Sequence, residues 1–65
     1  MRTIRDGNIG ANVVERKDGD GYDVYFLYNM NNPTHHGSHG DVCDRKTYKT
    51  IKMAFRKVAA YIKKG

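Results

Sequence analysis

Hydrophobic residues in the last third of the chain recur at spacings of three and four, the period of an amphipathic α-helix. The apolar positions are Tyr48, Ile51, Phe55, Val58 and Ile62. No Gly or Pro interrupts residues 44–64, and the Lys, Ala, Met and Ile residues there are compatible with helix. We therefore predict a helix over residues 44–64, with Asp44 or Thr47 capping its first turn.

Residues 1–30 alternate instead with a period of two, which is typical of half-buried strands. The clearest run spans residues 22–30, where Tyr22, Val24, Phe26, Tyr28 and Met30 share one face. Residues 9–17 form a weaker strand, and residues 1–5 form an edge strand or a frayed terminus. Turn-forming residues at 6–8 and the Gly-containing stretch 17–21 separate these runs.

These elements predict an α+β fold. It is an antiparallel β-hairpin, or a three-stranded meander if residues 1–5 pair, with one C-terminal amphipathic helix packed on one sheet face. We expect a single small domain over residues 1–65, with strands in 1–30, a His-rich loop at 31–43 and a basic helix at 44–64. The expected core is Val13, Val24, Phe26, Tyr28, Ile51, Phe55, Val58 and Ile62.

Positive charge is concentrated on the predicted helix. The chain has 65 residues and a net charge of +5. Residues 44–65 hold eight Lys or Arg and one Asp, whereas residues 1–43 hold four Lys or Arg and six Asp or Glu. Without intervening Glu, neighbouring like charges repel by about 0.2–0.5 kcal/mol per pair unless an anion compensates them. Such a cationic element indicates phosphate-backbone binding, although lysine-rich helix faces are also common where the only neighbour is solvent.

We therefore favour a small nucleic-acid-binding protein, not an enzyme, that contacts DNA or RNA phosphates through its helix. The candidate binding residues are Arg45, Lys46, Lys49, Lys52, Arg56, Lys57, Lys63 and Tyr25. Tyr25 and Leu27 lie on the expected uncovered sheet face, where they would meet a groove or stack on a base. The predicted topology resembles that of the small DNA-binding domains at the front of some tyrosine recombinases.

A protein-binding module is the main alternative. Many of the small basic proteins that phages and mobile elements encode dock on an acidic or nucleic-acid-binding surface of a host complex, which they modulate or inhibit, and we expect this chain to do so in the alternative interpretation. Exposed strand edges and a small core are also compatible with a homodimer. No stretch is long and apolar enough for a membrane span, and the lone Cys43 favours a reduced, cytoplasmic setting.

The stretch 31–43 contains further candidate chemistry. His35, His36, His39 and Cys43 carry donors that zinc accepts, but no second ligand pair recurs elsewhere, so we expect a polar loop and no cofactor. The triplet Gly37-Ser38-His39 resembles the motif around the catalytic His of small toxin-type mRNA interferases, which would imply a ribonuclease. In that family the triplet leads into a strand, whereas a helix is predicted here, so the activity is not carried over to His39.

Overall fold

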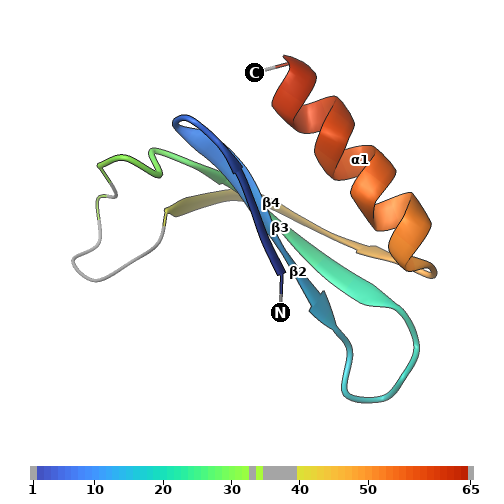
Figure 1. The fold of residues 1–65 in the computed structure, drawn as a ribbon. Coiled ribbons are helices and arrows are strands. Elements are labelled where there is room, and N and C mark those ends of the chain that lie inside the picture. Colours follow the sequence, from blue (N-terminus) through green and yellow to red (C-terminus); the bar gives the residue numbers. More distant parts are fainter. Residues whose placement is uncertain (1, 33, 35–39, 65) are drawn as a thin grey trace.

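The computed structural model describes residues 2–32, 34 and 40–64. Its four antiparallel strands form one sheet in chain order: β1 (Arg2–Asp6), β2 (Ile9–Glu15), β3 (Tyr22–Tyr28) and β4 (Asp41–Tyr48). The helix α1 (Ile51–Lys64) follows β4 and crosses one face of the twisted sheet (Figure 1). The predicted α+β fold with its C-terminal helix is confirmed, with four strands in place of two or three.

Two tight connections set the order of β1, β2 and β3. Gly7 and Asn8 join β1 to β2, and Gly7 has a φ of 65°, a value that glycine adopts without steric cost. The longer connection from β2 to β3 is closed by the Arg16 N–H, which donates to the Gly21 carbonyl at 3.0 Å. Both connections lie where the sequence predicted turns.

Strand β4 is the main difference from the sequence-based prediction, which placed a loop and the first helical turns there. Its residues pair with β3 from Tyr28↔Asp41 to Tyr22↔Tyr48, with an irregularity between Phe26 and Leu27. Tyr48 is the last residue of β4 and stands three residues before Ile51, so its match to the helical spacing was a coincidence. Pairing with β3 satisfies backbone groups that would otherwise lie on an open edge, and this outweighs a weak intrinsic preference for helix.

The helix consequently begins at residue 51 instead of 44. The Thr50 hydroxyl oxygen accepts a hydrogen bond from the Met53 N–H at 3.2 Å, and the Thr50 carbonyl accepts one from the Ala54 N–H at 3.1 Å. Thr50 is therefore the N-cap, and the prediction of Asp44 or Thr47 was wrong. The last turn carries Lys63 and Lys64, whose charge favours the negative end of the helix dipole.

The core lies between α1 and the side of the sheet that faces it. Its buried members are Ala11, Val13, Val24, Phe26, Ala54 and Val58. Two predicted core residues, Phe55 and Ile62, are half-buried. Two others are exposed, Tyr28 by 42% at the end of β3 and Ile51 by 37% at the start of α1. Small residues at Ala11 and Ala54, which the pattern overlooked, let the two layers approach closely.

A second, smaller buried group forms where the chain leaves β3. Met30 packs against Gly10, at which any added Cβ would collide with the Met30 sulfur. Since Ala11 faces α1, its neighbour Gly10 faces the opposite side of the sheet. The Met30 N–H donates to the Asn8 carbonyl at 3.0 Å, which fixes the segment after β3 to the β1–β2 turn.

We predict that Gly21→Ala destabilises the fold more than Gly19→Ala does. Gly21 has a φ of 114°, and a Cβ there would lie 2.5 Å from the Tyr48 carbonyl oxygen, whereas a Cβ at Gly19, with φ of 73°, would meet open space. Backbone strain alone costs about 1–3 kcal/mol. Urea denaturation should show the larger loss for Gly21→Ala, and equal midpoints for the two variants would contradict the turn geometry.

Candidate nucleic-acid interface

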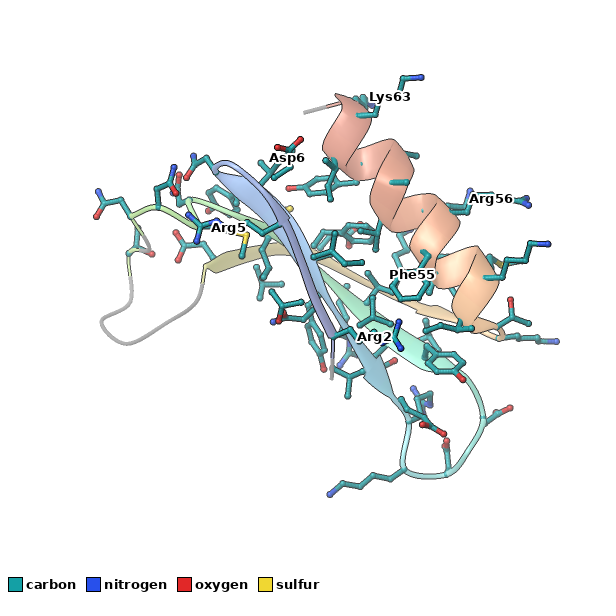
Figure 2. The ribbon with its side chains drawn as sticks, in the orientation of Figure 1. Arg2, Arg5, Asp6, Phe55, Arg56 and Lys63 are labelled. Atoms are coloured by element: carbon teal, nitrogen blue, oxygen red, sulfur yellow. The ribbon has the colours of Figure 1, made fainter. Side chains whose placement is uncertain are left out.

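Helix α1 carries the densest positive charge in the structure. Its fourteen residues include no acid, and its cations are Lys52, Arg56, Lys57, Lys63 and Lys64. All five are exposed. Figure 2 shows Arg56 and Lys63 pointing away from the sheet, on the side of the helix opposite the core. The helix therefore presents cations to solvent wherever it does not pack on the strands.

Three of these cations form a row. At roughly 100° per residue, Lys52, Arg56 and Lys63 fall within about 40° of one another around the helix axis. Their spacings of four and seven residues extend the row over about 16 Å at roughly 1.5 Å per residue. On the β1 side, Arg2 adds a further cation, since its guanidinium carbon lies 5.7 Å from the centre of the Phe55 ring (Figure 2).

Ion pairing in the described part of the chain lies elsewhere. Arg16 pairs with Asp18 at 3.4 Å and with Asp23 at 3.2 Å, and these two contacts are the salt bridges found among the described residues. The Thr47 hydroxyl, followed by Arg16, holds the pKa of Asp23 below its usual value. The Asp20 N–H, followed by Arg16, does the same for the pKa of Asp18. The cations of α1 have no carboxylate partner within these residues.

The predicted cationic face is divided by strand β4. Lys52, Arg56, Lys57 and Lys63 lie on α1 as expected, and the exposed Lys49 lies between β4 and α1. Arg45 and Lys46 belong to β4, where successive side chains point to opposite faces. Arg45 pairs in register with Tyr25 on the face away from α1, and Lys46 faces the helix. The structure thus separates Arg45 and Tyr25 from the helical cations.

The sheet face away from α1 exposes fewer candidate binding residues than the sequence predicted. Tyr25 is half-buried there, but Leu27 is only 2% exposed, so the prediction that Leu27 meets a groove or a base was wrong. A Cβ at Gly40 would lie 3.4 Å from the Leu27 Cβ, which shows that the chain entering β4 covers Leu27. Arg45 on this face lies near Asp23, whose charge offsets its own.

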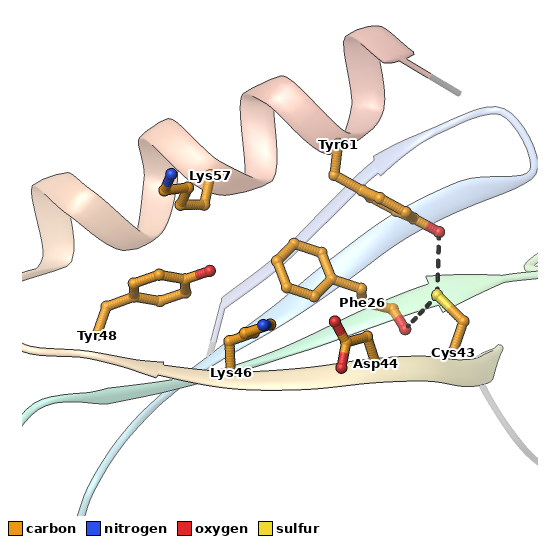
Figure 3. A pocket seen from close by; sticks show the side chains of 7 residues that line it. All are labelled: Phe26, Cys43, Asp44, Lys46, Tyr48, Lys57 and Tyr61. Atoms are coloured by element: carbon orange, nitrogen blue, oxygen red, sulfur yellow. Dashed lines mark hydrogen bonds between the residues drawn. The ribbon is translucent and has the colours of Figure 1, made fainter.

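A groove runs between β4 and α1, and we call it the β4–α1 groove (Figure 3). Its volume is about 230 Å³, and its lining residues are Phe26, Cys43, Asp44, Lys46, Tyr48, Lys57 and Tyr61. Three aromatic rings, two lysines, one carboxylate and one thiol therefore meet in one place. The sequence reading missed this site because residues 43–48 were expected in a loop and helix, whereas the groove requires them on a strand beside α1.

Hydrogen bonds hold the aromatic wall of this groove in place. The Tyr61 hydroxyl donates to the Leu27 carbonyl at 2.9 Å and contacts the Cys43 sulfur at 3.4 Å. The Cys43 thiol donates to the Phe26 carbonyl at 3.4 Å, as the dashed lines of Figure 3 show. The rings of Phe26 and Tyr61 meet edge to face, with centroids 5.0 Å apart and an interplanar angle of 60°. The groove is thus a preformed surface.

Of the four candidate metal ligands, the structure describes only Cys43. Cys43 lies exposed on β4, where its thiol makes the contacts just described. His35, His36 and His39 lie outside the described residues, as does the triplet that resembles the ribonuclease motif. Strand β4, and not the predicted helix, follows this triplet from Asp41 on, so the prediction on which the activity was not carried over to His39 was wrong. Within the ranges 2–32, 34 and 40–64, no three His, Cys, Asp or Glu side chains come together as metal ligands would. Asp41 instead accepts hydrogen bonds from Thr34 and Asn29.

Comparisons with protein-family models, curated proteins and solved structures find no match to this chain. No helix in the described part of the structure has the length and apolar character that crossing a membrane requires. The geometry and charge of the chain itself therefore carry the functional argument.

Alkaline pH should weaken the fold through Tyr61. Burial, followed by the hydrogen bond with Cys43, raises the pKa of Tyr61 from 10.0 to about 12. Because the pKa in the folded state exceeds that of the unfolded chain, this contribution to stability is complete below pH 10 and is lost as the pH rises towards 12. Tyrosinate absorbance is measured against pH for the wild type and for Tyr61→Phe, and the second curve is subtracted from the first. The difference curve should show one phenol that titrates near pH 12.

At neutral pH, Tyr61→Phe should lower the free energy of unfolding by about 0.5–1.5 kcal/mol, because the Leu27 carbonyl loses its donor. The matched control is Tyr28→Phe, which removes a hydroxyl from an exposed tyrosine at the end of β3. Its urea midpoint should equal that of the wild type. A difference titration centred near pH 10 would contradict the buried geometry of Tyr61.

Proposed function

We propose that this protein binds nucleic acid by laying the exposed side of α1 along a phosphate backbone. The observation that carries this proposal is the row Lys52, Arg56 and Lys63 on a helix with five cations, no acid and no ion pair among the described residues. The like charges of Lys52 and Arg56, four residues apart, repel one another, and a polyanion relieves that repulsion. A cationic stripe on one element is also the usual electrostatic footprint of nucleic-acid-binding proteins.

Among the described residues, no acid of the sheet forms an ion pair with a cation of α1, although Asp6 and Lys63 line a common hollow. Asp18 and Asp23 are engaged by Arg16, and Asp41 accepts hydrogen bonds from Thr34 and Asn29. Asp44 accepts a hydrogen bond from the Arg45 N–H at 2.8 Å. None of these contacts involves a cation of α1. Phosphates approaching the helix would therefore replace water and counterions and would not have to displace a carboxylate, which favours binding through counterion release.

Docking on a protein partner, whose acidic surface the cations would meet, stays the second candidate, and one observation favours a protein. Strand β4 forms an edge of the sheet over eight residues, and such an edge accepts a further strand from a partner or from a second copy. The Arg45 amide on this strand is already bonded to the Asp44 carboxylate, which opposes strand addition at that position. We therefore favour nucleic acid over a protein partner or a homodimer.

The proposal predicts that Arg56→Glu weakens binding much more than Lys17→Glu does. Both substitutions lower the net charge equally, but Arg56 belongs to the cationic row, whereas Lys17 lies exposed in the β2–β3 connection. Fluorescence anisotropy with labelled DNA and RNA across a salt series measures the effect. Losing one phosphate contact should reduce the log–log salt slope by roughly 0.9 on duplex DNA or 0.7 on a single strand.

The triple variant Lys52→Glu, Arg56→Glu, Lys63→Glu extends this test. It should remove roughly three phosphate contacts and reduce the log–log salt slope about three times as much as Arg56→Glu does. All three side chains are exposed, so circular dichroism should show the wild-type fold. If Arg56→Glu and Lys17→Glu weaken binding equally, net charge and not the α1 row is responsible. If the wild type binds neither DNA nor RNA at low salt, the proposed function fails.

A further inference from the structure

The β4–α1 groove combines the two kinds of group that single-stranded nucleic acids require. Its apolar lining comes from Phe26, Tyr48 and Tyr61, which are all aromatic, and its cations are Lys46 and Lys57. Figure 3 shows the rings between the helix and β4, with Lys46 on the strand side and Lys57 on the helix side. Aromatic platforms beside positive charge are how sequence-tolerant single-strand binding works, because every base has a stackable face.

The size of the groove suits one planar ring. Its volume of about 230 Å³ lies below the roughly 300–1,000 Å³ of sites that enclose drug-sized ligands. The ring of Tyr61 is held by its bond to the Leu27 carbonyl, and Phe26 is fixed in the core with 7% exposure. Phe26 therefore forms the floor of the groove, and the half-buried Tyr48 and Tyr61 supply the rings on which a base can stack. Walls held in this way need little ordering when a ligand enters, so less of the binding free energy is lost to entropy.

The carboxylate of Asp44 indicates whether a nucleobase or an acidic peptide suits the groove better as its ligand. Asp44 lines the same groove as Lys46 and Lys57, and it lies next to Lys46 on the β4 side (Figure 3). An acidic side chain of a peptide would meet the lysines and also be repelled by Asp44. A nucleobase, by contrast, presents ring or exocyclic N–H groups that a carboxylate accepts, while its negative charge lies outside on the phosphates. The mixture of two cations and one acceptor therefore favours a nucleotide.

We infer that the β4–α1 groove holds an unpaired base of a single-stranded nucleic acid, with Lys46 and Lys57 at the phosphates on either side. This inference rests on the proposed function and names its ligand class. Bases in a duplex have both faces covered by their neighbours and cannot enter the groove without unpairing and unstacking. The row on α1 then supplies backbone affinity, and the groove supplies the preference for single strands.

The substitution Tyr48→Leu tests the groove. It removes an aromatic wall while keeping an apolar side chain, and its matched control is Tyr28→Leu at an exposed tyrosine that does not line the groove. Anisotropy is measured with a labelled single strand of about 10 nucleotides and with the duplex of the same sequence. Tyr48→Leu should weaken single-strand binding about 5- to 150-fold and leave duplex binding unchanged. Tyr28→Leu should match the wild type on both probes.

The wild-type protein supplies a second measurement that needs no substitution. Cys43 is the single cysteine of the chain, is exposed and lines the groove. Its alkylation by iodoacetamide should slow several-fold when the single-stranded oligonucleotide is saturating, and much less with the duplex. Polyglutamate serves as the acidic-peptide probe and should not protect the thiol.

The outcomes separate the two proposals. If the single strand binds but Cys43 alkylates at its free rate and Tyr48→Leu binds normally, the groove assignment is overturned while the role of α1 stands. If polyglutamate protects Cys43 and the oligonucleotide does not, the groove is an acidic-peptide site and the inference is also overturned. If neither oligonucleotide binds at low salt, the proposed function fails together with the inference.

Discussion

The close packing of α1 on β2 and β3 is the interaction on which the rest of the structure depends. Ala54 and Val58 from the helix, and Ala11 and Val24 from the sheet, are essentially inaccessible to solvent. Because two of these four side chains are alanine, the layers come close together, and the rotation of the helix about its axis is fixed. That rotation turns the cationic row outwards, and it places Lys57 and Tyr61 above β4 where the groove forms (Figure 3).

The same packing explains which parts of the fold could be predicted. Val13, Val24 and Phe26 alternate along strands covered by the helix, and Val58 repeats with the helical period, so each pattern reflected real burial. The sequence of β4 shows no alternation of apolar and polar residues. Its residues on the helix side include Asp44 and Lys46, which line the open groove at this edge of the sheet and not the buried core. Without apolar alternation, the strand could not be distinguished from a polar loop and a helix start.

The cationic row and the β4–α1 groove also differ in how far the sequence could predict them. The cationic row depends only on the phase of one helix, so the sequence could place Lys52, Arg56 and Lys63 on a common side. The groove depends on residues far apart in the chain that only the β3–β4 pairing brings under α1. Arg45 was assigned to the helical face for lack of that pairing, and it lies on the opposite side of the sheet beside Tyr25.

Mapping amide chemical-shift changes by NMR during titration with a single-stranded oligonucleotide tests the central claim most directly. The account predicts that changes concentrate on α1 around Lys52, Arg56 and Lys63 and on the groove residues of β4, and that they diminish as salt is added. It also predicts little change on the opposite sheet face. Changes confined to that face, around Arg5, Asn12 and Tyr25, would contradict the account, since they would place the nucleic acid on the side of the sheet away from α1.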